Sequence, residues 1–246
     1  MSVRPAPLSQ AAAPAIAPGV ALPPRDCPLC PRLVTFRETQ RAAHPEWFNA
    51  PVPPFGDNAA ELLIVGLAPG LRGANRTGRP FTGDYAGSLL YATLRKFALA
   101  AGHYDARPDD GLALAGARIT NAVRCVPPQN KPEPREIANC REFLSGEIAA
   151  SPGLRAFLAL GAIAHGAVLT ALGLRRALFR FAHGAVHELP GGRLLADSYH
   201  CSRLNTNTGR LTAAMFEAVF EALLGRLNPD GRRGMHMPHG SMAKPP

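Results

Sequence analysis

The sequence predicts an α/β protein of three layers, αβα, in which a central, mostly parallel four-stranded sheet lies between helices. Short apolar runs typical of buried strands alternate along the chain with longer segments that carry apolar residues at helical spacing. Polar loops rich in glycine, arginine and asparagine follow several of these strands. Open α/β sheets bind their ligands in such loops, at the carboxyl ends of strands.

The chain of 246 residues is long enough for one domain with flanking tails. Residues 1–24 are rich in alanine and proline, and residues 227–246 in glycine, proline and basic residues, so we expect disordered tails around a single domain at 25–226. No apolar run approaches the roughly 20 residues that span a bilayer, and prolines interrupt the first apolar segment. We expect a cytoplasmic monomer that does not contact a membrane.

The net charge of +9, from 27 Lys and Arg against 18 Asp and Glu, suggests a polyanionic partner. Nucleic acid is the commonest such partner, and arginine, which supplies most of the positive charge, suits forked contacts to phosphate oxygens. The alternative is a protein that is merely basic. Charge alone therefore favours nucleic acid without establishing it.

The expected elements follow in chain order. They begin with a short helix that ends near Arg41, a proline-rich loop at 44–57 and a buried strand at Leu62–Val65. A helix at about 87–101 comes after a long loop. Further along we expect strands at 118–123 and 154–160, helices at 135–150 and 161–172, two short strands at 184–189 and 193–196, and a last helix at 212–224 capped by Thr212. Segment 174–181 has no clear pattern.

The loop from Gly66 to Asp84, GLAPGLRGANRTGRPFTGD, is the segment around which the other elements are arranged. Its five glycines and two prolines exclude a regular helix or strand. Arginines, an aromatic ring and a carboxylate lie close together in it, which favours a site for a planar, phosphorylated ligand over an ordinary crossover loop. A second polar loop covers 197–210. Because loops after parallel strands face one another, we expect Asp84, Asn121 and His200 to converge.

Five cysteines in a chain without a signal peptide argue against a disulfide framework. Cys27 and Cys30 form a C-x-x-C pair, Cys125 and Cys140 lie downstream, and Cys201 stands apart. Four thiolates suit either tetrahedral zinc or an iron–sulfur cluster, and the residues alone leave both open.

Three segments together resemble the motifs of family 5 uracil-DNA glycosylases, an iron–sulfur branch of the uracil-DNA glycosylase superfamily. The segments are the Gly66–Asp84 loop, NAVRC followed by PP and NKP, and SYHCSRLNTNTGRLT. The resemblance spans about Cys27 to Leu224. It implies a monofunctional base-excision repair enzyme that flips uracil, and other deaminated bases such as hypoxanthine, out of DNA and hydrolyses the N-glycosidic bond to leave an abasic site.

The resemblance also implies roles for residues around the base. Phe81 would stack on it, and the backbone at Gly66 and Leu67 would border it. His200 stands where the family places the histidine that donates a hydrogen bond to uracil O2, on which negative charge builds as the bond breaks.

Asp84 is the candidate that positions water or stabilises the sugar cation, and its alternative role is to cap the following helix. Other superfamily branches have a polar residue where this chain has Ala68, so the source of water activation stays open. Asn121 and Asn130 compete to read the base edge, since one amide both donates and accepts hydrogen bonds. We favour Asn121 slightly.

Contacts to DNA follow from the same resemblance. Leu204 would wedge into the space that the flipped base leaves. Cys201 replaces a residue that is often proline or a small aliphatic, and we expect it to loosen this loop. Arginines of both loops would contact phosphates: Arg72, Arg76, Arg79, Arg203 and Arg210.

The resemblance implies a four-iron, four-sulfur cluster, [4Fe–4S], bound by Cys27, Cys30, Cys125 and Cys140. Its expected role is to staple the amino-terminal segment to the loop after the second strand. A function of another class stays open: a non-catalytic nucleic-acid-binding protein with a metal- or cluster-stapled α/β fold. A small-molecule hydrolase is less favoured, because the loop has neither G-x-x-x-x-G-K-[ST] nor G-x-G-x-x-G.

Overall fold

A computed structural model describes residues 22–229 of the chain. Its central sheet has six strands in the order β1-β5-β2-β6-β8-β7. The four inner strands are parallel, and β1 and β7 pair antiparallel at the two edges. The α/β class and the mostly parallel sheet are confirmed, whereas the expected number of four strands is too small. Strand β1, which has only two residues, was missed, whereas β7 lies within the short strand expected at 184–189.

The strands of this sheet have the following bounds: β1 Phe55–Gly56, β2 Leu62–Gly66, β5 Ala117–Asn121, β6 Ala156–Leu160, β7 Val186–Glu188 and β8 Leu194–Ser198. A separate two-stranded sheet pairs β3 (Ala100–Ala101) with β4 (Ala113–Leu114). The helices are α1 Pro31–Ala43, α2 Ala74–Thr77, α3 Tyr85–Lys96, α4 Pro134–Ala149, α5 Ala162–Ala171, α6 Arg203–Asn207 and α7 Ala213–Leu227. Single 3-10 turns cover Pro128–Asn130 and Arg176–Leu178.

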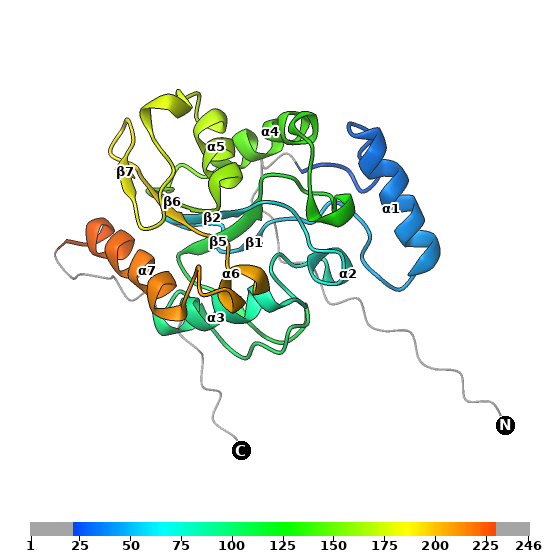
Figure 1. Cartoon of the computed structure of the whole chain (residues 1–246), viewed down its shortest axis with the longest axis horizontal. Coiled ribbons are helices and arrows are strands. Elements are labelled where there is room, and N and C mark those ends of the chain that lie inside the picture. Colours follow the sequence, from blue (N-terminus) through cyan, green and yellow to red (C-terminus); the bar gives the residue numbers. More distant parts are fainter. Residues whose placement is uncertain (1–21, 230–246) are drawn as a thin grey trace, which may run out of the picture.

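Helices cover both faces of the sheet, with α4 and α5 on one side and α3 and α7 on the other (Figure 1). The inner strands are buried on both faces, so successive residues alternate between the two layers. Leu63 and Val65 of β2 belong to the core under α4 and α5, and Leu62 and Ile64 belong to the core over α3 and α7. The three-layer αβα prediction is therefore confirmed.

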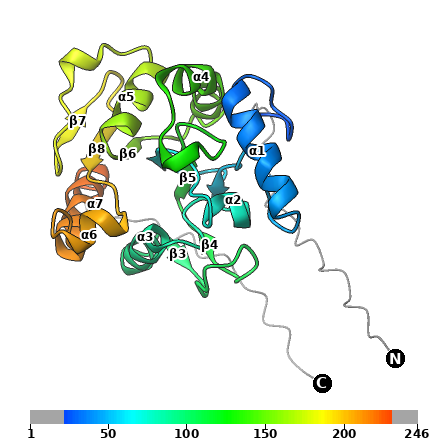
Figure 2. The ribbon, with the colours of Figure 1, turned by 45° about the vertical axis from the view of Figure 1, so that its right-hand side comes forward.

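Local signals explain where the helices begin. Asp84 caps α3 by accepting a hydrogen bond from the Gly87 N–H, and Thr212 caps α7 through the Met215 N–H, as predicted. Glu133 and Glu136 form a capping box at the start of α4. Helix α1 lies beside the sheet at the amino-terminal side of the fold (Figure 2).

Several sequence-based bounds need correction. The Gly66–Asp84 loop, from which regular structure was excluded, contains the single-turn helix α2, and the loop after β8 contains α6. Helix α3 ends at Lys96 rather than near 101. Leu227, expected to begin the second tail, is buried as the last residue of α7. Residues 1–21 and 230–246, which make up most of the two predicted tails, lie outside the described residues.

Candidate active site

Three segments far apart in the sequence meet at the carboxyl end of β2. Gly66 pairs with Asn121 in the parallel ladder of β2 and β5. A Cβ atom at Gly66 would lie 2.4 Å from Asn121 Oδ1 and 2.7 Å from Phe81 Cζ. The rings of Phe81 and His200 stack, with centroids 5.8 Å apart and 28° between their planes. Phe81, Asn121 and His200 therefore gather around Gly66, as the sequence predicted.

Phe81 is held in an unfavourable backbone conformation. Its φ is +52°, in the left-handed region that an aromatic residue rarely adopts, and its side chain is buried. Gly87 of α3 packs so closely against the Phe81 carbonyl that a Cβ atom there would lie 1.8 Å from the oxygen. The Tyr104 hydroxyl donates to the same oxygen at 3.3 Å. Such strain persists only where the surroundings impose it, and it is characteristic of ligand sites.

Arg79 is part of these surroundings rather than of the surface. Its side chain is buried and donates to both carboxylate oxygens of Asp110 at 2.8 Å and to Thr82 Oγ1 at 2.7 Å. Burial alone would raise the pKa of Asp110, but the hydrogen bonds and charge of Arg79 hold that pKa well below its usual range. The expectation that Arg79 contacts phosphate is therefore wrong, because its guanidinium ties the Phe81 turn to the segment before β4.

The two candidate asparagines differ in their surroundings. Asn121 is buried at the end of β5, and its Oδ1 has no hydrogen-bond partner among the described residues. Asn130 is exposed in the turn Pro128–Asn130, with a left-handed φ of +58°. A buried oxygen without a partner is rare in proteins and indicates a missing donor. Asn121 Oδ1 is thus placed to accept a hydrogen bond from an N–H group of a ligand.

Asp84 and His200 lie close enough to interact electrostatically. Burial lowers the pKa of the His200 imidazole, and the charge of Asp84 acts in the opposite direction. The imidazole is thus neutral at neutral pH and keeps one N–H to donate. Asp84 Oδ1 accepts the capping bond from Gly87 N at 3.3 Å, and its Oδ2 lies against the backbone of Gly73. The structure shows the capping role of Asp84, and its catalytic role stays a prediction.

The loop that follows His200 presents polar and apolar side chains to solvent. Leu204 is 73% exposed on α6, and Arg203 and Arg210 are exposed beside it. Asn205 Nδ2 donates to the His200 carbonyl at 2.8 Å and so connects α6 to the backbone of His200. Cys201 is fully buried in the core, and burial raises the pKa of its thiol to about 12. It therefore anchors the start of this loop, which corrects the expectation that it loosens the loop.

Two further predicted residues of the first loop, Arg72 and Arg76, are also exposed. The side chain of Leu67 is half-buried, and its carbonyl accepts from Val123 N at 2.9 Å, continuing the pairing of β2 and β5 beyond Gly66. Arginines from both loops thus remain accessible around the stacked rings.

The four cysteines of the predicted cluster site meet. Cys27, Cys30, Cys125 and Cys140 line one small pocket between α1, α4 and the loop after β5. Burial raises the pKa of the Cys125 thiol to about 12 and that of Cys140 to about 11, and the neighbouring thiols act in the same direction. Within residues 22–229, no three of these sulfurs lie within 4.8 Å of one another. Four thiolates on one tetrahedral zinc have sulfurs about 3.8 Å apart, which is closer than this arrangement.

N–H groups point at three of these sulfurs. Arg37 Nη1 lies 3.7 Å from Cys125 Sγ, Asn139 Nδ2 3.6 Å from Cys30 Sγ, and the Arg124 backbone N 3.4 Å from Cys140 Sγ. Hydrogen bonds of this kind stabilise anionic sulfur.

The charges buried near the cysteines are not balanced. Arg37, Arg118 and Arg124 are buried, whereas the buried carboxylate that faces Arg118 and Arg124 is Glu147. Arg37 Nε and Arg124 Nε and Nη1 have no hydrogen-bond partner in the described part of the chain. A second buried carboxylate, Glu136, is paired with Arg32, so the unpaired N–H groups of Arg37 and Arg124 leave positive charge that an anionic centre on the four sulfurs would neutralise. Sequence reasoning missed these arginines, because nothing in their local pattern marks them as buried.

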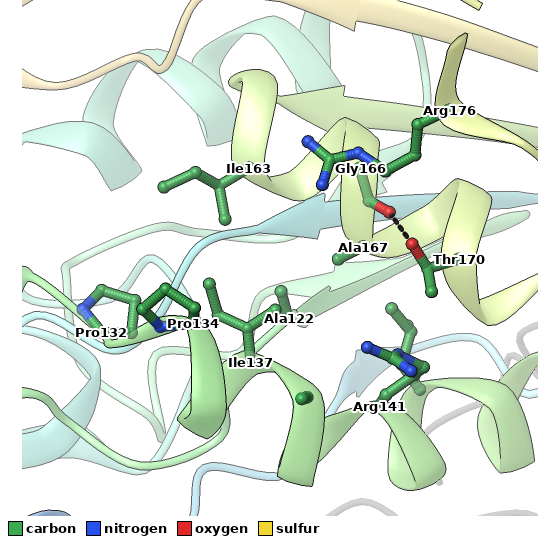
Figure 3. A pocket seen from close by; sticks show the side chains of 12 residues that line it. Ala122, Pro132, Pro134, Ile137, Arg141, Ile163, Gly166, Ala167, Thr170 and Arg176 are labelled. Carbon is green, nitrogen blue, oxygen red and sulfur yellow. Dashed lines mark hydrogen bonds between the residues drawn. The ribbon is translucent and has the colours of Figure 1, made fainter. Parts of the chain in front are cut away.

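A separate cavity of about 420 Å³ lies between α4 and α5 (Figure 3). Apolar side chains such as Ile137 and Ile163 line it, and the Arg176 guanidinium lies across Gly166. None of the predicted site residues lines this cavity. The residues that meet at the carboxyl end of β2, and not the volume of a cavity, therefore identify the candidate active site.

The fold and this site define the class of protein. Residues 53–224 match the model of the Uracil DNA glycosylase superfamily. Relatives share this match over most of their length: the type-5 uracil-DNA glycosylase of Thermus thermophilus is 49% identical over 203 residues, which cover 80% of this chain and 92% of that protein. The type-5 enzyme of Pyrobaculum aerophilum is 44% identical over 79% of this chain and 86% of its own, and that of Mycobacterium leprae 43% over 79% and 88%.

The chain belongs to the type-5 uracil-DNA glycosylases, which confirms the family resemblance.

Proposed function

We propose that this protein excises uracil from DNA by hydrolysing the N-glycosidic bond, leaving an abasic site for base-excision repair. The observation that carries the proposal is the meeting of the Phe81 ring, the unpartnered Asn121 oxygen and the His200 imidazole around Gly66. One aromatic face, one amide and one neutral donor are what a flipped nucleobase requires.

Base recognition rests on the Phe81 face and the Asn121 amide. Uracil N3–H is a donor that fits the partnerless Oδ1 of Asn121. A buried acceptor left unpaired costs about 1–3 kcal/mol, and a bound base with this N–H removes that cost. Gly66 has no side chain, so the space against Asn121 Oδ1 and the Phe81 ring stays free of a Cβ atom, and the backbone of Leu67 lies beside it.

Bond cleavage needs stabilisation of the negative charge that develops on uracil O2. The neutral His200 imidazole donates a hydrogen bond to that oxygen, and this bond strengthens as charge accumulates. Asp84 places its negative charge near the sugar cation and orients the attacking water. Ala68, near the start of the same loop, has no polar group. Asp84 therefore orients the water without help from a side chain at that position.

The surrounding loops bind the DNA backbone. The exposed arginines Arg72, Arg76, Arg203 and Arg210 contact phosphates, and Leu204 enters the stack where the base has left it. Arg79 is excluded from this set by its burial. We further propose that the pocket also accepts other deaminated bases such as hypoxanthine, and that the protein acts as a single domain and a monomer in the cytoplasm. None of the described helices is both long and apolar enough to cross a membrane.

We assign a [4Fe–4S] cluster to Cys27, Cys30, Cys125 and Cys140. The meeting of the four cysteines, the N–H groups aimed at their sulfurs and the unpaired buried N–H groups of Arg37 and Arg124 support it, because these groups leave an excess of positive charge. A cluster in its common dicationic state, bound by four thiolates, is a dianion and neutralises that excess. When bound, it supplies a rigid staple between α1 and the loop after β5, and no step of the base-removal chemistry passes through it.

A strand-break assay tests the proposed activity. The protein is incubated with a duplex that contains one uracil, and alkali then breaks the strand at abasic sites. We expect breaks with the wild type, almost none with the Asp84→Ala, His200→Ala double variant, and a loss with Asn121→Ala that the matched variant Asn130→Ala does not show. Tight binding without breaks would instead support the non-catalytic DNA-binding alternative. Equal activity of both asparagine variants would discard the reading of the base by Asn121.

Iron and sulfide analysis of the purified protein tests the cluster. We expect four irons per chain, brown colour, and loss of both in Cys140→Ser. Arg124→Met removes a buried positive charge without touching a ligand, and we expect faster loss of iron in air than in Arg135→Met, whose arginine is exposed. Zinc in place of iron in the wild type would overturn the assignment.

A further inference from the structure

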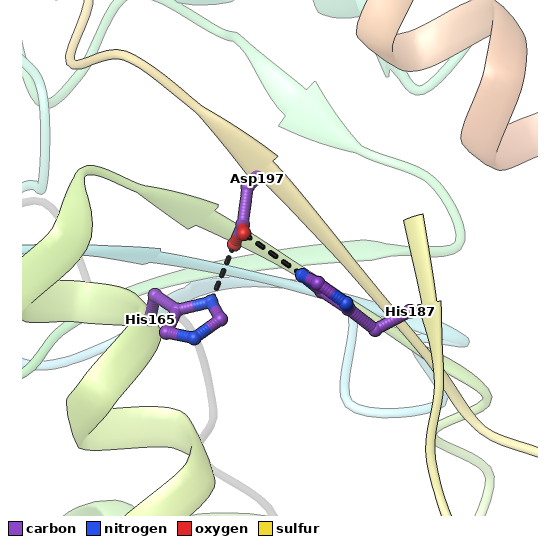
Figure 4. A group of neighbouring side chains, drawn as sticks. All are labelled: His165, His187 and Asp197. Carbon is purple, nitrogen blue, oxygen red and sulfur yellow. Dashed lines mark hydrogen bonds and ion pairs between the residues drawn. The ribbon is translucent and has the colours of Figure 1, made fainter. Parts of the chain in front are cut away.

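A second group of ligating side chains lies away from the cysteines, between β8, β7 and α5. His165 and His187 lie on either side of the Asp197 carboxylate, and both rings point at it (Figure 4). One ligating atom from each residue lies within 4.8 Å of the other two. Asp197 is fully buried, and a buried carboxylate needs a cation or hydrogen-bond donors beside it.

The surroundings of the His165 ring leave one position for a cation, between His165 Nδ1 and the Asp197 carboxylate. His165 Nε2 lies 2.9 Å from the Phe179 carbonyl oxygen, and Nδ1 lies 2.7 Å from Asp197 Oδ1. A neutral imidazole has a single N–H. If that N–H donates to Phe179, the Nδ1 lone pair faces the carboxylate directly, and a proton or a metal ion must stand between them.

The second histidine favours a metal ion over a proton. His187 Nε2 lies 3.1 Å from Asp197 Oδ2, so a second imidazole nitrogen faces the other oxygen of the same carboxylate. One proton needs only one histidine, whereas two imidazoles and one carboxylate form a common ligand set for divalent transition metals. Metal-bound histidines also typically donate their other N–H to a backbone carbonyl, as His165 does to Phe179.

We propose that His165 Nδ1, His187 Nε2 and one oxygen of Asp197 bind a zinc-class divalent ion, with a fourth position open to water. Ligand atoms around tetrahedral zinc lie about 3.3 Å apart. The two histidine nitrogens contact different oxygens of Asp197, at 2.7 and 3.1 Å, so binding the ion through one oxygen requires the carboxylate to turn as well as the contacts to widen. The His187 side chain is 18% exposed, which gives the ion and its water a path from solvent.

The ion would act as a structural staple. The three ligands come from α5, β7 and β8, and Asp197 Oδ2 also accepts from Ala182 N at 3.3 Å. Asp197 precedes His200 by three residues on the same segment. An ion here therefore fixes the end of β8, from which the base-site imidazole projects, without touching the base.

Metal analysis of the intact protein tests this site. Wild-type protein with its cysteine site loaded is equilibrated with Zn²⁺, passed through a desalting column and analysed for zinc and iron. We expect one zinc per chain in addition to the iron. His187→Ala is the test variant because its side chain reaches solvent, and His183→Ala is the matched control from the same segment. We expect His187→Ala to lose the zinc and keep the iron, and His183→Ala to keep both.

Thermal unfolding supplies a second measurement. We expect added Zn²⁺ to raise the Tm of the wild type and of His183→Ala and to leave that of His187→Ala unchanged. Retention of the zinc by His187→Ala, or absence of zinc from a wild type that keeps its iron, overturns the proposal. An NMR spectrum of the zinc-equilibrated protein with protons on both nitrogens of His165 also overturns it, because the group is then an imidazolium–carboxylate pair.

Discussion

The two loops that form the base site differ in how they are held. The first, Gly66–Asp84, is anchored by buried polar side chains, including Arg79 on Asp110 and Asn75 on Asn49. The second, from His200 to Arg210, is mostly exposed after Cys201. A base site needs a fixed face against which the base is placed and a part that follows the DNA. In the proposed site, the first loop would supply the fixed face through Phe81, and the second would supply the imidazole and the wedge.

Removing the anchor of the first loop, Arg79, should have the largest effect on the protein. Arg79→Met leaves the Asp110 carboxylate buried without its partner, and we expect a loss of about 3–5 kcal/mol in the free energy of unfolding. Urea unfolding measures this. The control Arg76→Met, at an exposed position in the same loop, should change stability by no more than about 0.5 kcal/mol. Equal effects of the two substitutions would mean that the first loop is not held by Arg79.

A substitution in the second loop should act on the rate instead of on stability. His200→Ala removes one donor to the developing oxyanion, and we expect uracil release under single-turnover conditions to slow by about 10²–10³-fold. The Tm should change little, because the ring is only half-buried. His103→Ala, at an exposed histidine outside the site, is the control. A large fall in Tm with an unchanged rate would assign His200 to the fold.

The wedge should give a smaller effect. Leu204→Ala shortens an exposed side chain that has no contact to lose in the free protein, so stability should not change. We expect uracil release from duplex DNA to slow by up to about tenfold, the range of a lost apolar contact, with little effect on single-stranded DNA. The ratio of the two rates is the measurement, and Thr208→Ala on the same exposed segment is the comparison. An unchanged ratio removes Leu204 from the wedge role.

The smallest expected effect is a shift in the titration of the imidazole. Because burial lowers the pKa of His200, its NMR midpoint should lie below the ordinary value of about 6.5, so the ring is neutral above that pH and gains its proton only below it. Asp84 raises this pKa, so Asp84→Asn should move the midpoint lower still. A midpoint that moves upward would show that the two residues do not face each other as described.

The long elements of the fold were predictable because their apolar patterns are strong. Leu62–Gly66 and Ala156–Leu160 are buried throughout, and Thr212 caps α7 as expected. The edge strand β1 and the single-turn helices α2 and α6 were missed, because segments of two to five residues have no period to detect. Tertiary contacts, rather than local sequence preference, determine these short segments.

In the site, the sequence indicated residue types but not their surroundings. The chain belongs to the family that the motifs around Gly66 and His200 suggested, and in the structure Phe81 lies against Gly66 and stacks on His200. Arg79 was assigned to the surface because an arginine in a glycine-rich loop has the same sequence pattern whether it faces phosphate or a buried carboxylate. Only its partner Asp110, 31 residues away, separates the two cases.

The 5.8 Å between the centroids of Phe81 and His200 has a consequence for how substrates are admitted. A base stacked on one ring and covered by the other needs two contact distances of about 3.5 Å each, which together exceed this gap. The imidazole thus rests on the surface that an incoming nucleobase must take, and entry requires its displacement toward the base's edge. The His200 ring would thus compete with a nucleobase for the face of Phe81. Hydrogen bonds of the base to Asn121 would have to offset the ring contact that is lost.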